Sequence, residues 1–202
     1  MKKIILFDID DTIINTELFR KIQDKTLANY LGVDDQEIKK VRSDYYFSLK
    51  KSTDFFIDDY LKIVAQKYHH DLENLKKVFF GQRNIQLCLY EDVKPIFVKL
   101  KKLGYTLGVF SEGFVSFQKF KLETNDLLKF FDHEYIFLLR RKIDPNILKK
   151  LPQNTIIVDD KPTIINKLKN FANITPIQII RENKQDNPKV TEKVITSLSE
   201  LI

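Results

Sequence analysis

Short apolar runs recur along the chain, and each has the length of a strand. A strand that is buried on both faces of a parallel sheet is typically a nearly continuous apolar run, because helices cover both of its faces. One further segment follows this pattern less closely and is a weaker candidate. The predicted strands are residues 4–7, 105–110, 155–158 and 174–180, with residues 134–139 as the weaker candidate.

Between these runs, apolar residues recur at the spacing of a helix. Apolar residues between positions 93 and 103 recur at that spacing, and Gly104 follows where a helix end favours a left-handed residue. Three further segments open with a proline, which suits a first helical turn because its missing N–H is not needed there. Strands that alternate with helices predict an α/β fold with a doubly wound, Rossmann-like parallel sheet. The proline-led helices are predicted over residues 145–150, 162–171 and 188–201, and the C-terminal tail is expected to pack on the core.

Residues 17–87 interrupt this alternation. They contain no buried-strand run, and their apolar residues recur at helical spacing, with breaks at Gly32, Ser52 and Gly81. We therefore predict a Rossmann-like core formed by residues 1–15 and 91–202, with an inserted helical unit over residues 16–90. Six aromatic residues in the insert are expected to form its core, and a wall that faces a substrate is the alternative. They are Tyr45, Tyr46, Phe47, Phe55, Phe56 and Tyr60.

Composition and charge narrow the class of protein. Hydrophobic residues make up 43% of the 202 positions, which is enough for a packed core. Lys+Arg number 34 against 28 Asp+Glu, so the formal charge is +6, but the lysines are spread out and no basic run favours nucleic acid. The single cysteine, Cys88, excludes an internal disulfide and indicates a reducing compartment. No apolar run fits a signal peptide or a membrane span, so we predict a cytoplasmic protein without a membrane partner.

Acidic side chains follow two of the predicted strands. Asp8, Asp10 and Asp11 come directly after the first strand, and Asp159 and Asp160 end the strand at 155–158. Open α/β sheets place their ligands at the carboxyl ends of strands. Carboxylates gathered there would repel one another, and a divalent cation relieves that repulsion. Carboxylate oxygens and water are the ligands that Mg²⁺ takes, so the pattern predicts a Mg²⁺ site.

Two further residues have the chemistry to hold phosphate. Ser111 ends a predicted strand just before the flexible Gly113, where a hydroxyl and exposed backbone N–H groups could hold phosphate oxygens. Lys142 supplies a cation just before a helix. Each signal has a simpler alternative. The first acidic loop could cap a helix through Asp11 or Thr12, Ser111 could be a turn serine, and Lys142 could be a surface lysine.

Taken in order, these signals resemble the haloacid dehalogenase-like superfamily, whose members are mostly phosphatases, and the likeness covers nearly the whole predicted core. The helical insert looks like the cap that this family carries after its first motif. The matching positions are Asp8, Asp10 and Thr12 in the first motif, Ser111 in the second, Lys142 with Asp144 and Pro145 in the third, and Asp159 with Asp160 in the fourth.

The resemblance implies a mechanism and a role for each residue. Asp8 would be the nucleophile and form an aspartyl-phosphate, and Asp10 would be the general acid and base. Ser111 and Lys142 would hold the phosphate, and Thr12 would orient the loop. Mg²⁺ would be held by Asp8, the backbone carbonyl of Asp10, and one or both of Asp159 and Asp160.

The expected substrate is a small phosphorylated metabolite such as a nucleotide or a sugar phosphate. In this family an acid at the position of Asp10 accompanies phosphate chemistry, because halide departure needs no proton. Hydrolysis is therefore expected over dehalogenation. Phosphomutase chemistry, a phosphate-binding regulatory module without turnover, and action on nucleic-acid ends are the alternatives. The sequence leaves the substrate's identity and the oligomeric state open.

Some positions depart from the family pattern. Asp11 stands where glycine is common, and Glu112 stands where asparagine is usual and could repel phosphate. Ile143 replaces the proline that usually follows the lysine of the third motif, so Arg141 or Lys121 could substitute for Lys142. The three histidines, at positions 69, 70 and 133, lack metal-ligand spacing and are expected to be surface or packing residues.

Overall fold

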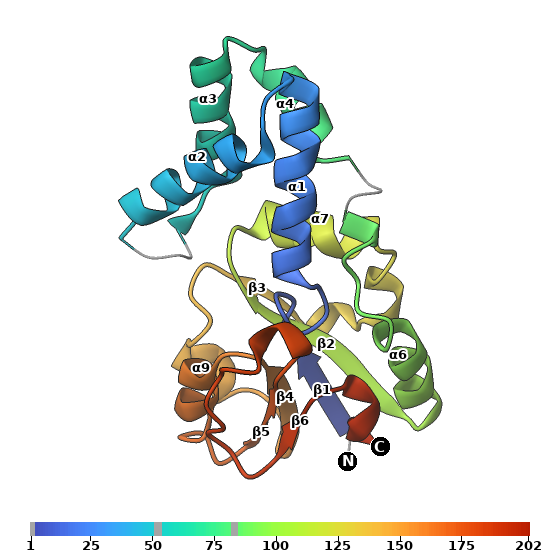
Figure 1. Ribbon diagram of the computed structural model, residues 1–202. Helices are drawn as coiled ribbons and strands as arrows, with labels where there is room; N and C mark the ends of the chain where they lie inside the picture. Colours follow the sequence, from blue (N-terminus) through green and yellow to red (C-terminus); the bar gives the residue numbers. More distant parts are fainter. Residues whose placement is uncertain (1–2, 51–53, 82–84) are drawn as a thin grey trace. The chain divides into compact units, whose positions relative to one another are not determined.

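A computed structural model describes residues 3–50, 54–81 and 85–202 of the chain (Figure 1). The chain forms two compact units, one made of Met1–Asn15 with Leu89–Ile202 and the other of Thr16–Cys88. The predicted break at Ser52 lies outside the described residues.

The first unit is built on a six-stranded parallel sheet. Its strand order is β3-β2-β1-β4-β5-β6, which is the order of a Rossmann fold and places β1 in the middle. Five of the strands lie where the apolar runs predict them, and β6 was not predicted. The strands are β1 (Lys3–Phe7), β2 (Tyr105–Glu112), β3 (Ile136–Leu139), β4 (Thr155–Asp159), β5 (Ile174–Ile179) and β6 (Val194–Ile195).

Helices connect these strands and flank the sheet. Gly104 adopts the left-handed conformation, with φ 81°, where α6 ends, as its position predicts. The prolines at 145 and 162 occupy first turns, so both predicted helices are present, although each is shorter than expected. The sequence did not reveal α7, because its inward face carries the polar Gln118 and Lys121 and so lacks a clean apolar stripe. These helices are α6 (Val93–Lys102), α7 (Val115–Thr124), α8 (Pro145–Leu148) and α9 (Pro162–Leu168).

The predicted helix over residues 188–201 is wrong. The segment forms no helix before β6, which pairs with β5 through Gln178↔Val194 and Ile179↔Ile195. A capping box formed by Ser197 and Glu200 then starts a short 3₁₀ helix, Leu198–Leu201. Pairing with the sheet edge therefore overrides the helical spacing of the apolar residues. The tail packs on the core as expected, since Ile195 and Leu198 are buried.

The second unit is helical, as predicted. Gly32 adopts φ 68° at the end of α1, which confirms the predicted break there. Tyr60 is buried, and its ring packs against those of Tyr45 and Phe55. Tyr46 and Phe47 are exposed, so the aromatic group forms this core only in part. The helices are α1 (Thr16–Leu31), α2 (Asp35–Ser48), α3 (Ile57–Tyr68) and α4 (Leu72–Phe79).

At Gly108, β2 lies very close to neighbouring backbone and side-chain atoms. A Cβ atom at this position would overlap the backbone carbonyl oxygen of Tyr135 and the side chain of Leu6. We expect Gly108→Ala to destabilise the protein by about 3 kcal/mol, because a backbone atom cannot rotate away from the added carbon. Urea unfolding measures this loss. Thr106→Ala on the same strand meets no such obstacle and should cost under about 1 kcal/mol. Equal losses in the two variants would contradict the close approach.

Candidate active site

Three buried carboxylates gather at the carboxyl ends of the two central strands. Asp8 follows β1, Asp159 ends β4 and Asp160 comes next, and one oxygen of each lies within 4.8 Å of the others. Sheet pairing produces this arrangement, because the Asp8 N–H donates to the Val158 carbonyl across the two strands at 2.9 Å. The first acidic loop does not cap a helix through Asp11 or Thr12, since α1 begins at Thr16.

Lys142 is the cation that contacts these carboxylates. Its side chain is only 1% exposed, and its Nζ lies 2.7 Å from Oδ1 of Asp8 and also pairs with Oδ2 of Asp159. Burial pulls the pKa of Lys142 down, but the two carboxylates outweigh burial and raise it, so the ammonium stays charged. Of the two substitutes considered for this position, Lys121 pairs with Asp10 and Arg141 lies beside Glu112. Lys142 is therefore not a surface lysine.

Oxygen atoms in this cluster are available to a cation. Within the described part of the chain, Oδ2 of Asp8 and Oδ1 of Asp160 are buried and have no hydrogen-bond partner. Both oxygens of Asp159 are engaged, one by Lys142 and the other by the backbone N–H of Lys161 at 2.8 Å. Buried carboxylate oxygens without partners are costly unless something binds them. The donor set of hard oxygens therefore fits a divalent metal, with Asp8 and Asp160 offering the unpaired atoms.

Burial, together with the charges of Asp159 and Asp8, raises the pKa of Asp160 to about 8. In the unfolded chain an aspartate has a pKa of about 3.9, so between these two values the folded protein holds a proton that the unfolded chain lacks. Stability should therefore fall as pH rises through this window, by up to about 1.4 kcal/mol per pH unit. Urea unfolding between about pH 5 and pH 8 with a chelator present measures the slope. Asp160→Asn should flatten it, and an equal slope in both proteins would contradict the raised pKa.

Helix α7 supplies two side chains that hold Asp10. Lys121 Nζ lies 2.6 Å from Oδ1 of Asp10, and Gln118 Nε2 donates to Oδ2 at 2.8 Å. Gln118 also reaches the buried Ser111, with its Nε2 3.3 Å from Oγ. Burial by itself raises the pKa of Asp10, but attraction to Lys121 and the bonds from Lys121 and Gln118 outweigh it and lower the pKa well below its ordinary value.

The contacts of Gln118 were missed from the sequence, and Lys121 was considered only as a substitute for Lys142. The one signal that could have found them is their i, i+3 spacing, which puts them on the same face of a helix that follows the strand containing Ser111.

The neighbours of Ser111 differ from expectation. The N–H of Gly113 donates to the Leu139 carbonyl at 2.8 Å, so this N–H is already used by the protein. Gly113 has φ 152°, and a Cβ atom there would crowd Gln118. Glu112 lies 3.8 Å from Nη1 of Arg141, which offsets its negative charge. The concern that Glu112 repels phosphate is therefore reduced.

Asp11 and Thr12 complete the first loop. Asp11 has φ 54°, a region that glycine enters freely and that aspartate tolerates better than most residues, so its presence in place of glycine is explained. Its carboxylate accepts from Nδ2 of Asn183 at 3.1 Å and pairs with Lys184 at 3.2 Å. The Thr12 side chain is fully buried.

Neither histidine nor cysteine joins the acidic cluster among the residues that the structure describes. His69 ends α3 in the left-handed conformation, and His70 packs on the ring of Tyr30. Burial raises the pKa of the Cys88 thiol to about 12. The thiol is therefore protonated and unreactive at neutral pH, and Cys88 packs as a small hydrophobic residue. In the same part of the chain, no helix is both long enough and apolar enough to cross a membrane.

We compared the chain with protein-family models, curated proteins and solved structures. A family model described as haloacid dehalogenase-like hydrolase matches residues 2–170. No curated protein matches the chain.

Three similar solved structures have between 16% and 23% sequence identity to the chain, which shows a shared fold. A HAD phosphatase from Thermococcus onnurineus is 23% identical, with a TM-score of 0.64 over 100% of this chain and 96% of that one. The HAD-hydrolase YfnB from Bacillus subtilis, bound to magnesium, is 16% identical, with a TM-score of 0.65 over 99% and 96%. A 2-haloacid dehalogenase from Pseudomonas syringae is 20% identical, with a TM-score of 0.67 over 100% and 96%.

Proposed function

The chain belongs to the haloacid dehalogenase-like hydrolase family, and we propose that it is a Mg²⁺-dependent phosphatase for a small phosphorylated metabolite such as a nucleotide or a sugar phosphate. One observation carries the proposal. The buried Asp8 carboxylate has one oxygen on Lys142 and a second oxygen without a partner in the described structure, and Asp160, in the same acidic cluster, also has an oxygen without a partner there. Each carboxylate oxygen has two lone pairs, so Oδ2 of Asp8 could bind the metal while Oδ1, which Lys142 orients, uses its second lone pair to bond phosphorus.

The residues that would hold Mg²⁺ are Asp8, Asp160 and Asp159, together with the backbone carbonyl of Asp10. Asp160 is the better direct ligand of the fourth-motif pair, because Asp159 already accepts from Lys142 and from the N–H of Lys161. When bound, the ion neutralises charge on the phosphoryl oxygens and helps align them. Asp159 then keeps Lys142 in position.

The reaction follows from the contacts of Asp8 and Asp10. An oxygen of Asp8 attacks phosphorus, the bond to the leaving oxygen breaks, and Asp10 gives that oxygen a proton. In the second step water attacks phosphorus, Asp10 takes the proton, and the bond to Asp8 breaks to release phosphate. Lys142 and Ser111 hold the phosphoryl oxygens, and Thr12 orients the loop.

Lys121 favours the ionised form of Asp10, which is the form that the second step requires. An incoming phosphate would compete for Lys121 and so allow Asp10 to take up the proton that the first step needs.

Asp10 also favours phosphate chemistry over dehalogenation, because a departing halide needs no proton whereas a departing alkoxide does. Phosphomutase chemistry uses the same groups and differs in where the phosphoryl group goes next. A phosphate-binding module without turnover is less favoured, because Arg141 offsets the charge of Glu112 and Lys142 pairs with Asp8 despite the altered third motif. The protein would act in the cytoplasm, without nucleic acid as its partner, and residues 16–90 would be the cap that selects the substrate.

Phosphate release tests the proposal. Purified protein is incubated with a generic aryl phosphate and then with a panel of phosphorylated metabolites, with Mg²⁺ or with a chelator. A 2-haloacid serves as the competing substrate. We expect Mg²⁺-dependent phosphate release and no halide release. Halide release without phosphate release would identify a dehalogenase, and binding of Mg²⁺ and phosphate without turnover would identify a regulatory module.

A further inference from the structure

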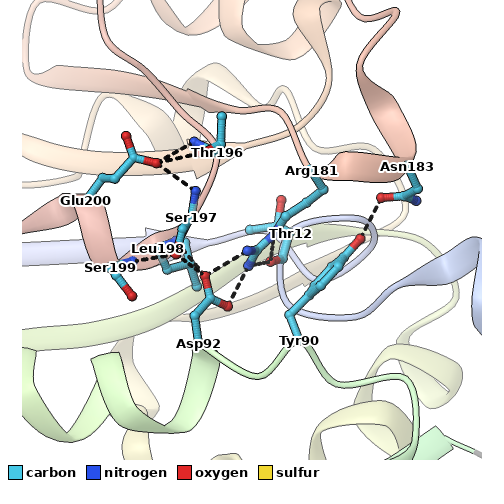
Figure 2. A network of polar contacts seen from close by, with 10 residues as sticks. All are labelled: Thr12, Tyr90, Asp92, Arg181, Asn183, Thr196, Ser197, Leu198, Ser199 and Glu200. Atoms are coloured by element: carbon cyan, nitrogen blue, oxygen red, sulfur yellow. Dashed lines mark hydrogen bonds and ion pairs between the residues drawn. The ribbon is translucent and has the colours of Figure 1, made fainter.

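A buried arginine, Arg181, lies just beyond β5 and contacts the loop that carries Asp8 and Asp10. Its Nε and Nη2 both donate to the backbone carbonyl of Thr12, at 3.2 and 2.6 Å (Figure 2). Only 5% of Arg181 is exposed. The two residues are 169 positions apart in the sequence, so this contact links the C-terminal region to the first loop.

Arg181 is itself held from two sides. Its Nη1 and Nη2 pair with the two carboxylate oxygens of Asp92, at 2.7 and 3.1 Å, and its guanidinium lies 4.1 Å from the ring centre of Tyr90. Asp92 also accepts from Oγ of Ser197 and from the N–H of Leu198, each at 2.7 Å. A planar guanidinium that is stacked and held by two parallel bonds has little freedom to turn, which lysine could not reproduce.

Asp92 bonds to Arg181 and to the C-terminal segment, and it does not cap its own helix. Asp92 is the N-cap residue of α6, where an aspartate ordinarily accepts a bond from the first turn of its own helix. Its side chain makes no such bond and instead reaches Arg181 and the C-terminal segment (Figure 2). Helix α6 therefore has no side-chain cap from Asp92, because the Asp92 carboxylate holds Arg181 instead.

The loop that Arg181 contacts is compact. The carbonyl of Ile9 accepts from the N–H groups of Ile13 and Ile14, each at 2.9 Å, and the N–H of Asp11 donates to the carbonyl of Ile14 at 2.8 Å. Thr12 belongs to this turn, and its carbonyl accepts from Arg181. A shift of the turn would move the backbone carbonyl of Asp10 and the start of the loop at Asp8, and errors of about 1 Å in reacting groups can cost about 100-fold in rate.

We propose that Arg181 is a positioning residue that fixes the loop of residues 8–14 in the geometry that metal binding and reaction require. This inference rests on the proposed function, but its first readout does not depend on turnover. Arg181 contacts neither Asp8 nor the fourth-motif acids in the contacts described, and it acts through the Thr12 carbonyl.

Hydrogen exchange of the metal-free protein tests the proposal, with Arg181→Met as the main variant. We expect the backbone N–H groups of residues 8–14 to exchange at least about 10-fold faster than in the wild type. Mg²⁺ affinity by calorimetry should weaken, and kcat on an aryl phosphate should fall by about 10- to 100-fold with KM within about 3-fold. Arg181→Lys keeps the charge but not the parallel bonds, so it should lie between the wild type and Arg181→Met in all three measurements.

Arg42→Met is the matched control. Arg42 is also a shielded arginine that bonds one carboxylate, Asp24 at 2.6 Å, and one backbone carbonyl, that of Arg20 at 3.0 Å, but it belongs to the helical unit. It should leave exchange in residues 8–14 and Mg²⁺ affinity unchanged.

Unchanged exchange and Mg²⁺ affinity in both Arg181 variants would overturn the inference. Faster exchange with unchanged Mg²⁺ affinity and kcat would also overturn it, because the contact would then be only structural. If the wild type binds Mg²⁺ but releases no phosphate, the proposed function fails, and exchange together with Mg²⁺ affinity still decides the role of Arg181. If Arg181→Met does not fold, the same measurements on Arg181→Lys decide it.

Discussion

Asp8→Asn should abolish phosphate release, with a loss of at least about 10⁴-fold in kcat, as is typical when a covalent nucleophile is removed. The amide oxygen and nitrogen are poor nucleophiles, and the substitution also removes one charge from the proposed metal site. Folding should be retained, because Asp8 and Asp159 repel the charge of Asp160 and contribute to its raised pKa. Removing one of these charges relieves that repulsion. A continuous phosphate assay with circular dichroism as the folding check measures both effects.

Asp11→Asn is the matched control for this experiment. It makes the same chemical change three residues later in the same loop, at a position with φ 54° that asparagine also tolerates. The Asp11 carboxylate bonds to Asn183 and Lys184 and is not one of the three acids of the buried cluster. We expect this variant to keep kcat within about 5-fold, since the contact that it weakens is a partly exposed ion pair. Equal activity in Asp8→Asn and the wild type would refute Asp8 as the nucleophile.

Lys142→Met should lower both stability and activity. The methionine leaves Asp8 and Asp159 buried without their cation, and removing one partner of a buried ion pair typically costs about 3–5 kcal/mol. The lost charge would also cost about 100- to 1000-fold in kcat, because a cation near the phosphoryl oxygens stabilises the transition state. Urea unfolding of the metal-free protein and phosphate release from the folded variant measure the two effects.

Lys119→Met provides the comparison for Lys142→Met. Lys119 pairs with Glu123 at 3.5 Å on the exposed side of α7, and such surface pairs contribute under about 1 kcal/mol. If Lys119→Met loses little stability and Lys142→Met loses much, the burial of Lys142 between two carboxylates explains the difference. Equal and small losses in both variants would contradict the assignment of Lys142 to the site.

The sequence predicted the parts of this molecule that depend on local pattern. Five of the six strands are apolar runs, and the carboxylates that follow β1 and β4 come together because parallel strands end at the same edge of the sheet. Lys142 lies beside Asp8 although Ile143 replaces the expected proline, so the lysine, and not the residue after it, determines the contact.

The contacts that were missed depend on the folded surroundings. Gln118 and Lys121 face Asp10 from a helix whose apolar pattern their own polarity obscures. The tail was predicted to be helical because its apolar residues recur at helical spacing, but β6 pairs with the open edge of β5 instead. Arg181 reaches Thr12 across the fold, and no short-range pattern in the sequence indicates such a contact.

In the proposed reaction, Asp8 becomes bonded to phosphorus beside a metal held by acids from two strand ends. The most direct measurement is peptide mapping by mass spectrometry after rapid acid quenching of the enzyme during turnover with Mg²⁺ and an aryl phosphate. We expect the peptide containing Asp8 to gain one phosphoryl group, and we expect no gain with a chelator or in Asp8→Asn. A phosphoryl group found on another residue, or steady turnover with none on the protein and full activity in Asp8→Asn, would contradict it.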